Sequence, residues 1–393
     1  MMNHLPATNA SASQPSLFGL NPANPYPAFA KLRAQGAVVP VPLPAAYRQG
    51  VVWLVTRFDD AVQVLRDPRF TIDARVLDAP NGAPGQPHTR ASSDVGIFGG
   101  RSMIDVDGVD HARLRGLVSK AFTPRYIETL RPNIQRIADD LLDRVQARGA
   151  MDLVHAYGYP LPITVICDML GVPYDRRDRL RDGSTSIADL VAAQRRRPGE
   201  DLLSQLVRLE AAGDHLDDHE LRAMVALLIV AGHETTANLI SSGVLTLLDH
   251  PDALARLQAD PDLIPGAIEE LLRVNGPVLT PAPRFARADL NVGGQRIRRG
   301  DLVLVSLGAA NHDEAAFTDP ESLEIARALN RHLACGQGMH FCLGAPLARL
   351  EGDIAFRTLL RRMPSLRLNA PRARIRWRGT VTLRGLTALP VAF

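Results

Sequence analysis

A glycine-rich stretch near the C-terminal end of the chain contains four residues whose side chains bind metals. Gly336, Gly338 and Gly344 allow its backbone to bend and to approach another group closely. A helix is predicted over 347–363, and amide N–H groups and the helix dipole near a helix start favour a cysteine thiolate. Such a thiolate is a good ligand for a soft metal. The four residues fall within eleven positions and are His332, Cys335, His340 and Cys342.

Three interpretations of Cys342 remain open from this stretch alone. The first is a buried structural cysteine, which is common for a cysteine of an intracellular protein. The second is a zinc site, although the spacing matches no common zinc pattern and a tight glycine turn can direct only some of these side chains inward. The third is an axial thiolate ligand of haem iron. The rest of the chain has to decide between them.

A second candidate site lies in the middle of a long predicted helix. The pattern from 217 to 250 is helical without a breaker, which corresponds to roughly 50 Å at about 1.5 Å per residue. The middle contains the sequence Ala231-Gly232-His233-Glu234-Thr235-Thr236. A glycine, a carboxylate and two β-branched hydroxyl residues are poor helix formers, and such residues inside a strong helix often mark a functional site. A kinked helix with a paired glutamate is the alternative.

Two other predicted helices contain charged residues at helical spacing. The basic helix over 110–121 contains His111, Arg113 and Arg115. The helix over 265–274 contains Glu270 and Arg273, which are three residues apart and therefore lie on one face. An exposed pair of this kind contributes only a few tenths of a kcal/mol, whereas a buried pair needs further partners.

Composition excludes several classes of protein. The 393 residues are 46% hydrophobic and 22% charged, which is typical of a globular protein with a sizeable core. The net charge of +3 is too small to indicate nucleic-acid binding. Three cysteines make no disulfide framework and favour a reducing compartment. We find no signal peptide and no apolar run of the ~18 residues that span a membrane, so we expect a cytoplasmic protein without a membrane partner.

The predicted elements favour a mainly α protein with a minor β portion. Helices are predicted over 26–35, 58–66 and 163–170, and one from 124 to near 149. Short strands are predicted at 38–39, 51–55, 290–292, 301–305 and in the tail after 366. Residues 1–24 are predicted to be a flexible arm and 25–393 a single domain. The long loop over 74–104 is of a length that is usually functional.

Four separated motifs together resemble the cytochrome P450 family, the haem-thiolate monooxygenases, from about residue 26 to the end. The first is the cysteine loop from Gly336 to Gly344, and the second is the oxygen-activating segment Ala231 to Thr236. The third is Glu270-Leu271-Leu272-Arg273, and the fourth is His111-Ala112-Arg113-Leu114-Arg115. The resemblance is closest to soluble bacterial members and implies the cytochrome P450 fold, with heme b (iron protoporphyrin IX) as the cofactor.

The resemblance implies a role for each matching residue. Cys342 would be the metal ligand on the proximal side, within a loop that ends at Gly344. Thr235 would hydrogen-bond to oxygen on the distal side, and Glu234 would relay protons from solvent. Glu270 and Arg273 would be structural, with Arg327 as their third partner. The groups that bind the haem propionates would be His111, Arg115, Arg284 and His340.

The resemblance also implies the reaction and its partners. The enzyme would insert one atom of dioxygen into a hydrophobic substrate of secondary metabolism, with electrons from a ferredoxin-type donor that docks on the Cys342 face. Arg113, Arg349 and Arg361 are candidate contacts for that donor. Oxidative coupling or desaturation is an alternative outcome, and a haem-thiolate sensor without turnover is an alternative from another class of protein.

Two departures from the family pattern distinguish this chain. Cys335 occupies the position seven residues before the cysteine ligand, where the family usually has phenylalanine. A smaller thiol there leaves space and can alter hydrogen bonding near the sulfur, and hence the iron potential. The stretch 173–198 is also short for the two helices and loop that normally cover the substrate channel. This length predicts either a shortened lid or an open pocket for a bulky or carrier-tethered substrate.

Overall fold

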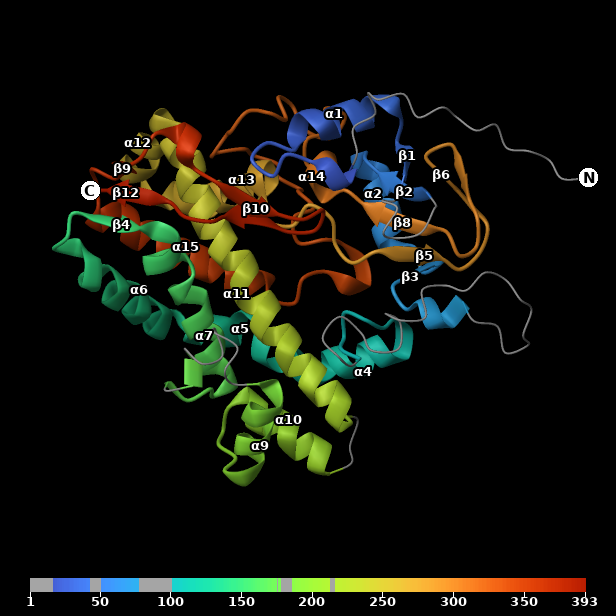
Figure 1. The fold of residues 1–393 in the computed structure, drawn as a ribbon, viewed down its shortest axis with the longest axis horizontal. Helices are drawn as coiled ribbons and strands as arrows, with labels where there is room; N and C mark the ends of the chain where they lie inside the picture. The colour runs from blue at the N-terminus through green and yellow to red at the C-terminus, as the bar shows by residue number, and fades with distance from the viewer. Residues whose placement is uncertain (1–16, 43–50, 78–100, 175, 178–185, 213–215) are drawn as a thin grey trace, which may run out of the picture.

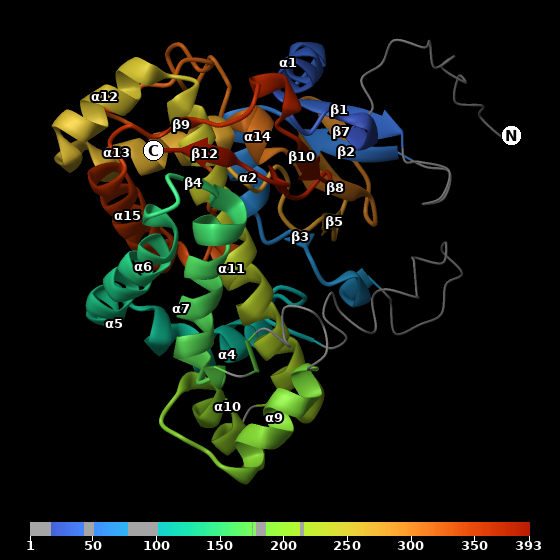
Figure 2. The same cartoon turned by 60° about the vertical axis from the view of Figure 1, so that its left-hand side comes forward.

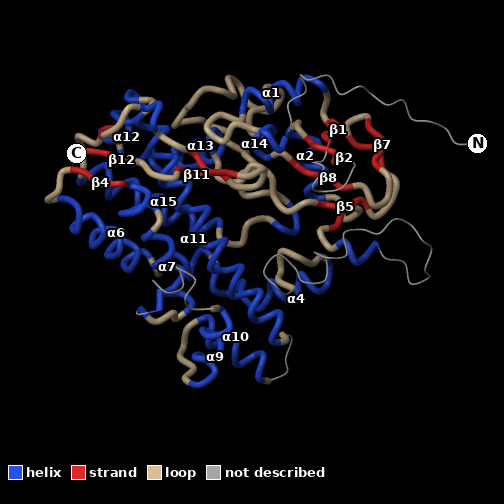
Figure 3. The backbone as a smooth tube through the Cα atoms, in the orientation of Figure 1, coloured by secondary structure: helices blue, strands red, loops and turns tan. Residues whose placement is uncertain are grey.

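The computed structural model describes residues 17–42, 51–77, 101–174, 176–177, 186–212 and 216–393. The expectation of a mainly α protein with a minor β portion is confirmed: helices make up most of the molecule, the largest sheet lies at one side, and other short strands lie among the helices (Figure 3). Within the described parts, the helices are α1 (Tyr26–Gln35), α2 (Phe58–Arg66), α4 (Gly108–Ser119), α5 (Pro124–Thr129), α6 (Arg131–Gln146), α7 (Pro160–Leu170), α9 (Ile187–Arg196), α10 (Leu202–Ala211), α11 (Asp218–Leu248), α12 (Pro251–Ala259), α13 (Ile264–Asn275), α14 (Leu307–Ala310) and α15 (Ala345–Arg362).

The strands are shorter than the helices and form four small sheets in the described parts. The largest sheet has the strand order β1-β2-β8-β5-β3, in which β2 and β8 are parallel and the other neighbours are antiparallel. The strands are β1 (Val38–Pro42), β2 (Val51–Val55), β3 (Phe70–Thr71), β4 (Ala150–Asp152), β5 (Arg284–Ala286), β6 (Leu290–Val292), β7 (Gln295–Ile297), β8 (Leu302–Val305), β9 (Arg367–Leu368), β10 (Trp377–Gly379), β11 (Arg384–Leu386) and β12 (Pro390–Ala392).

The predicted long helix is confirmed as α11, which crosses the whole molecule (Figure 1). Its start is fixed by a capping box, because the Asp217 side chain accepts from the Glu220 amide and the Glu220 side chain accepts from the Asp217 amide. By length and composition α11 is the one helix in the described ranges that is able to span a membrane. However, 61% of its most apolar stretch is buried inside the protein. Helices α7, α13 and α15 pack against it.

Two local expectations differ from the structure. The helix predicted from 124 to near 149 divides at Leu130 into α5 and α6, because Pro132 at the start of α6 has no N–H to continue the bonding pattern. In the predicted flexible arm, Leu17 is fully buried in a cluster with Phe29 and residues of β1 and β2, so the arm contacts the domain at this residue. Residues 1–16 lie outside the described parts, and the flexibility expected of the arm stays a prediction.

The segment around 173–198 contains one full helix, α9, and α10 follows it. Both pack against the N-terminal half of α11 at one end of the molecule, as two views show (Figures 1 and 2). Residues 175 and 178–185 lie outside the described parts, as do residues 78–100 of the predicted long loop. The role expected for that loop stays a prediction.

Candidate active site

A cavity of about 410 Å³ lies between α11 and the glycine-rich loop that precedes α15. Its apolar wall includes Ile166, Leu227, Leu228, Val278 and Leu383. Apart from Glu234, every predicted site residue lines this cavity: His111, Arg115, Thr235, Arg284, His340, Cys342 and Gly344.

The loop before α15 presents the Cys342 side chain to the cavity. Gly336 and Gly338 have φ values of 70° and 74°, a conformation that favours glycine. A Cβ on Gly338 would also lie 2.5 Å from the Leu65 carbonyl oxygen. Gly344 is different from the expectation: its φ of −81° is ordinary, so the turn does not require glycine there. Its ideal Cβ would point to within 4.0 Å of Cys342 Sγ, so glycine instead keeps the space beside the sulfur open.

Cys335 lies directly beside Cys342. The Cys342 amide donates to the Cys335 carbonyl oxygen at 2.9 Å, and both residues line the cavity. A hydrogen bond from the Cys335 thiol lowers the pKa of Cys342, and the Gly344 amide and the Arg115 charge lower it further against the effect of burial. The same contact raises the pKa of Cys335. The directions of the two shifts favour Cys342 as the thiolate of the pair.

We expect Cys335→Phe to raise the pKa of Cys342, because the variant loses the hydrogen bond that lowers it most. A higher pKa leaves a smaller fraction of Cys342 as the thiolate at neutral pH. Alkylation of the haem-free variant at neutral pH will therefore be slower than in the wild type. In the haem-loaded protein the iron potential or the carbon-monoxide-bound spectrum will shift. Alkylation rates across pH and a redox titration measure these effects. If all three remain at wild-type values, Cys335 only fills space.

Arg115, Arg284 and His111 line the cavity, and none of the three forms an ion pair with a carboxylate in the described parts of the chain. Arg284 is 4% exposed, and burial lowers its pKa to about 10. It donates to the Ala282 carbonyl oxygen at 3.2 Å, and Arg115 donates to the Phe341 carbonyl oxygen at 2.8 Å. His111 has a buried Nε2 without a partner. Buried donors of this kind need anionic partners, and the two propionates of a haem match them in charge and number of acceptors.

Asp107 fixes the position of His340. Its carboxylate accepts from His340 Nε2 at 2.7 Å, from Thr71 Oγ1 at 2.5 Å and from the Ile72 amide at 2.7 Å. Burial alone would raise the pKa of Asp107, but the bonds from His340 and Thr71 hold it well below its usual value. The His340 ring also meets the His111 ring edge-on, with 4.5 Å between centroids. Burial, together with the charges of His340 and Arg115, lowers the pKa of His111 to about 4.

The zinc interpretation does not fit this arrangement. His332 Nε2 contacts Glu269 at 3.1 Å, and His340 is paired with Asp107, so the two histidines point to different carboxylates. No group of three or more histidine, cysteine, aspartate or glutamate side chains in the described ranges is arranged to hold a metal ion. Of the four residues that suggested zinc, only the cysteine pair and His340 reach the cavity.

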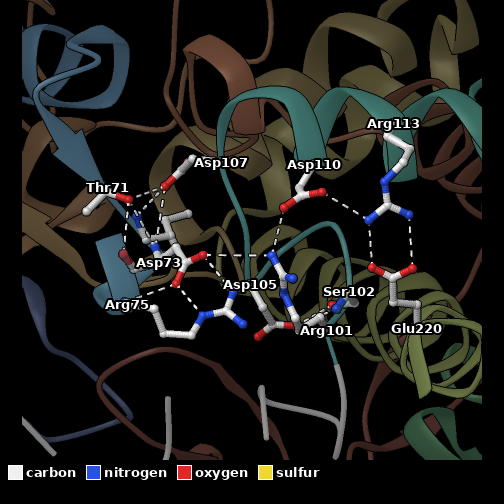
Figure 4. A network of polar contacts seen from close by, with 11 residues as sticks. Thr71, Asp73, Arg75, Arg101, Ser102, Asp105, Asp107, Asp110, Arg113 and Glu220 are labelled. Carbon is white, nitrogen blue, oxygen red and sulfur yellow. Dashed lines mark hydrogen bonds and ion pairs between the residues drawn. The ribbon is translucent and has the colours of Figure 1, made fainter. Parts of the chain in front are cut away.

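A network of charged residues joins α4 to α11 and to the end of β3 (Figure 4). Arg113 donates to both carboxylate oxygens of Glu220, at 2.6 and 2.9 Å, and also to Asp110. Glu220 therefore caps α11 and anchors α4 at once. This finding argues against Arg113 as a contact for an electron donor, because its guanidinium is already bound within the molecule. Sequence reasoning missed Glu220, whose capping pattern was the available signal.

In the central segment, Thr235 and Glu234 face different surroundings. Thr235 lines the cavity, and its hydroxyl donates to the Ala231 carbonyl oxygen at 3.0 Å. This local bond leaves the oxygen lone pairs of Thr235 available on the cavity side. Glu234 points away from the cavity and accepts from Arg378 at 2.8 Å, with a quarter of its side chain exposed. The acid thus lies between solvent and the hydroxyl.

Comparisons with known proteins show what the whole chain is similar to. A family model described as Cytochrome P450 matches residues 176–366. Cytochrome P450 107B1 of Saccharopolyspora erythraea is 46% identical over 368 residues, covering 86% of this chain and 88% of that protein. Cytochrome P450 monooxygenase PikC of Streptomyces venezuelae is 42% identical over 392 residues, covering 94% of this chain and 91% of that protein.

A solved structure extends the comparison to the fold. P450BioI in complex with hexadec-9Z-enoic acid ligated Acyl Carrier Protein matches with a TM-score of 0.83 at 34% identity, covering 95% of this chain and 99% of that chain. The alignment with Cytochrome P450 107B1 has 368 positions but covers only 86% of the 393 residues of this chain, and the alignment with PikC has 392 positions but covers only 94%. Both relatives therefore have residues that have no counterpart in this chain. These values do not place the additional residues along the chain, so the expectation that the stretch 173–198 is short stays a prediction.

Proposed function

This chain belongs to the cytochrome P450 family of haem-containing oxidoreductases, and we propose that it inserts one atom of dioxygen into a C–H or C=C bond of a hydrophobic natural product. One observation carries the proposal. A single cavity brings a cysteine thiolate, a set of propionate-binding donors and a distal hydroxyl together within apolar walls. A reducing, cytoplasmic location fits the three free cysteines.

Haem, when bound, supplies the redox chemistry that activates dioxygen, and the protein supplies ligand, access and protons. Cys342 provides the thiolate ligand, which the Cys335 thiol and the Gly344 amide stabilise. Arg115 and Arg284 would bind the propionates by charge-assisted hydrogen bonds, with His111 and His340 as further donors. Asp107 holds the His340 ring in place for this role.

Thr235 and Glu234 manage protons on the distal side. Thr235 presents a neutral hydroxyl to the cavity, where it orients oxygen and passes on protons without bringing a charge into an apolar site. Glu234 lies outside that wall and exchanges protons with solvent. This arrangement, with the Thr235 hydroxyl inside the cavity and the Glu234 acid outside it, supports delivery of protons while bulk water stays out.

We expect Thr235→Ala to divert dioxygen from product to hydrogen peroxide, because the cavity loses the hydroxyl that orients and protonates oxygen. Positioned proton donors contribute roughly 10²–10⁴-fold to a rate, so the yield of product per reducing equivalent will fall strongly while peroxide rises. The amounts of peroxide and of product are each compared with the reducing equivalents consumed. Thr235→Ser is the matched control and should stay near wild type. An equal yield of product per reducing equivalent in all three proteins would contradict the role of Thr235.

Electrons come from a separate donor, for which we propose a ferredoxin-type protein that docks on the Cys342 face. Arg361 has a side chain that is 71% exposed and remains a candidate contact. Arg349 is 38% exposed and already pairs with Glu269 at 2.7 Å, so it has less freedom to bind a partner. Stopped-flow reduction with a ferredoxin at two salt concentrations tests this proposal, since a charged interface weakens with salt.

The substrate is a hydrophobic molecule, and the short 173–198 segment supports a bulky or carrier-tethered one. A structural relative was solved with a fatty acid on an acyl carrier protein, which makes that acid a useful probe. Titration of the haem spectrum with hexadec-9Z-enoic acid, free and carrier-bound, compares the two forms. Tighter binding of the carrier-bound form is expected. Tight binding of free fatty acids or small terpenes alone would instead favour a shortened lid over an ordinary small-molecule pocket.

A further inference from the structure

The ion pair between Glu234 and Arg378 joins two segments that are far apart in sequence. Arg378 Nη1 lies 2.8 Å from Glu234 Oε1, and the arginine belongs to β10 in the C-terminal tail. The next residue on α11, Thr235, faces the cavity. Arg378 thus meets the proposed proton relay from the solvent side. Its side chain is 49% exposed, so the pair adds little to stability, and its importance lies in where it holds the carboxylate.

The position of Arg378 is set by a well-anchored hairpin. Strand β10 pairs with β11, with Arg378 opposite Gly385. A Cβ on Gly385 would collide with the Asn238 side chain, so the hairpin packs directly on α11 one turn beyond Glu234. The hairpin turn contributes Thr382 and Leu383 to the cavity wall. The backbone of Arg378 therefore belongs to a hairpin that lines the site and not to a loose tail.

A second contact fixes the base of this hairpin. Arg384 is buried, stacks on Trp377 at 3.9 Å and donates to the Tyr26 hydroxyl at 2.9 Å. The Leu279 amide donates to the Thr382 carbonyl oxygen at 2.8 Å, which ties the turn to another part of the cavity wall. These contacts restrict the hairpin on both sides of Arg378, so the guanidinium has a defined place from which to bind Glu234.

We propose that Arg378 is the positioning residue for proton delivery, holding the Glu234 carboxylate at the outer side of the cavity wall beside Thr235. The inference rests on the proposed function, in which Glu234 exchanges protons with solvent. Without the guanidinium, the Glu234 side chain is free to rotate away from α11 into solvent. A proton relay depends on hydrogen-bond distance, and small misplacements cost up to ~10²-fold in rate.

The test uses the haem-loaded full chain, which is reduced, mixed with dioxygen in a stopped-flow instrument and then given a second electron by an excess of reduced ferredoxin, because proton delivery follows that second electron. The return of the haem absorbance to its resting state is followed in H₂O and D₂O, so that no substrate is needed. We expect Arg378→Gln to slow this return at least severalfold and to change its solvent isotope effect, and Arg378→Lys to restore much of the rate. Arg376→Gln is the matched control, because Arg376 is an exposed arginine of the same segment bonded only weakly to the Ala373 carbonyl oxygen.

Glu234→Gln and the double variant separate the two proposals. If Glu234→Gln leaves both the rate and the isotope effect unchanged, the proton role of Glu234 fails. If Glu234→Gln slows the return but Arg378→Gln behaves like Arg376→Gln, the inference about Arg378 is wrong. Arg378 acts through Glu234 only if the double variant is no slower than Glu234→Gln, so multiplicative effects also overturn it. Crystal structures should show Glu234 displaced in Arg378→Gln, and an unmoved side chain contradicts the proposal independently of activity.

Discussion

Replacement of Cys342 by serine is expected to abolish oxygenase activity and the thiolate-type spectrum of the carbon monoxide complex. Serine is a poor ligand because its hydroxyl stays protonated at neutral pH, whereas the site lowers the pKa of the cysteine so that it binds as a thiolate. The propionate-binding residues are unaffected, so the variant should still take up haem, with reduced affinity. Difference spectra of the reduced, carbon-monoxide-treated protein measure the effect.

Two sulfur-removing controls make this result specific. Cys167 is fully buried in the helical core, and Cys167→Ala should keep the thiolate spectrum. Cys335 lies beside Cys342 in the same cavity, so Cys335→Ser examines whether the neighbouring thiol replaces the ligand. A thiolate spectrum that survives in Cys342→Ser but disappears when Cys335 is also replaced would make Cys335 the ligand, and the assignment of Cys342 would be wrong.

The sequence was sufficient to predict the residues whose positions depend on local geometry. A few consecutive backbone conformations in the glycine-rich loop place Cys342 before a helix start. The short-range spacing of the glycines and the cysteine in the sequence indicates these conformations. The long helix α11 was equally clear, since its sequence contains no breaker for the length of the molecule. The resemblance also implied Arg327 as a partner of Glu270, and Arg327 does bind it, at 3.1 Å.

The partners that complete the site could not be predicted in the same way. Asp107 meets His340 across 233 positions of sequence, and Arg378 meets Glu234 across 144. Exposed arginines and aspartates are common, and nothing in their local sequence distinguishes those that meet a site residue in the folded chain. The direction of the Glu234 side chain was likewise hidden, because helical spacing orders side chains around an axis without showing which face meets the cavity.

Substitution of Arg273 by leucine is expected to cost about 3–5 kcal/mol of unfolding free energy, the largest stability effect that we predict. Arg273 and Glu270 are both fully buried and share two hydrogen bonds of 2.8 Å. Arg273 also donates to the carbonyl oxygens of Asn311, Pro320 and Ser322. Leucine would leave these carbonyl groups without their donor and would remove the principal counter-ion of Glu270.

The effect of this substitution should also reach the haem site. Arg273 binds the irregular segment that leads to the cysteine loop, and Glu270 binds Asn330 within that segment at 3.0 Å. Arg273→Leu should therefore release haem at lower urea concentrations than global unfolding requires, because the cysteine loop loses its support. Arg136→Leu is the matched control: it removes an exposed pair with Asp140 on α6, which does not line the cavity, and should cost no more than about 1 kcal/mol. Urea unfolding followed by circular dichroism and by haem absorbance compares the two variants. Equal costs would show that the buried cluster does not stabilise the fold, since burial is what separates a strong charge cluster from a surface pair.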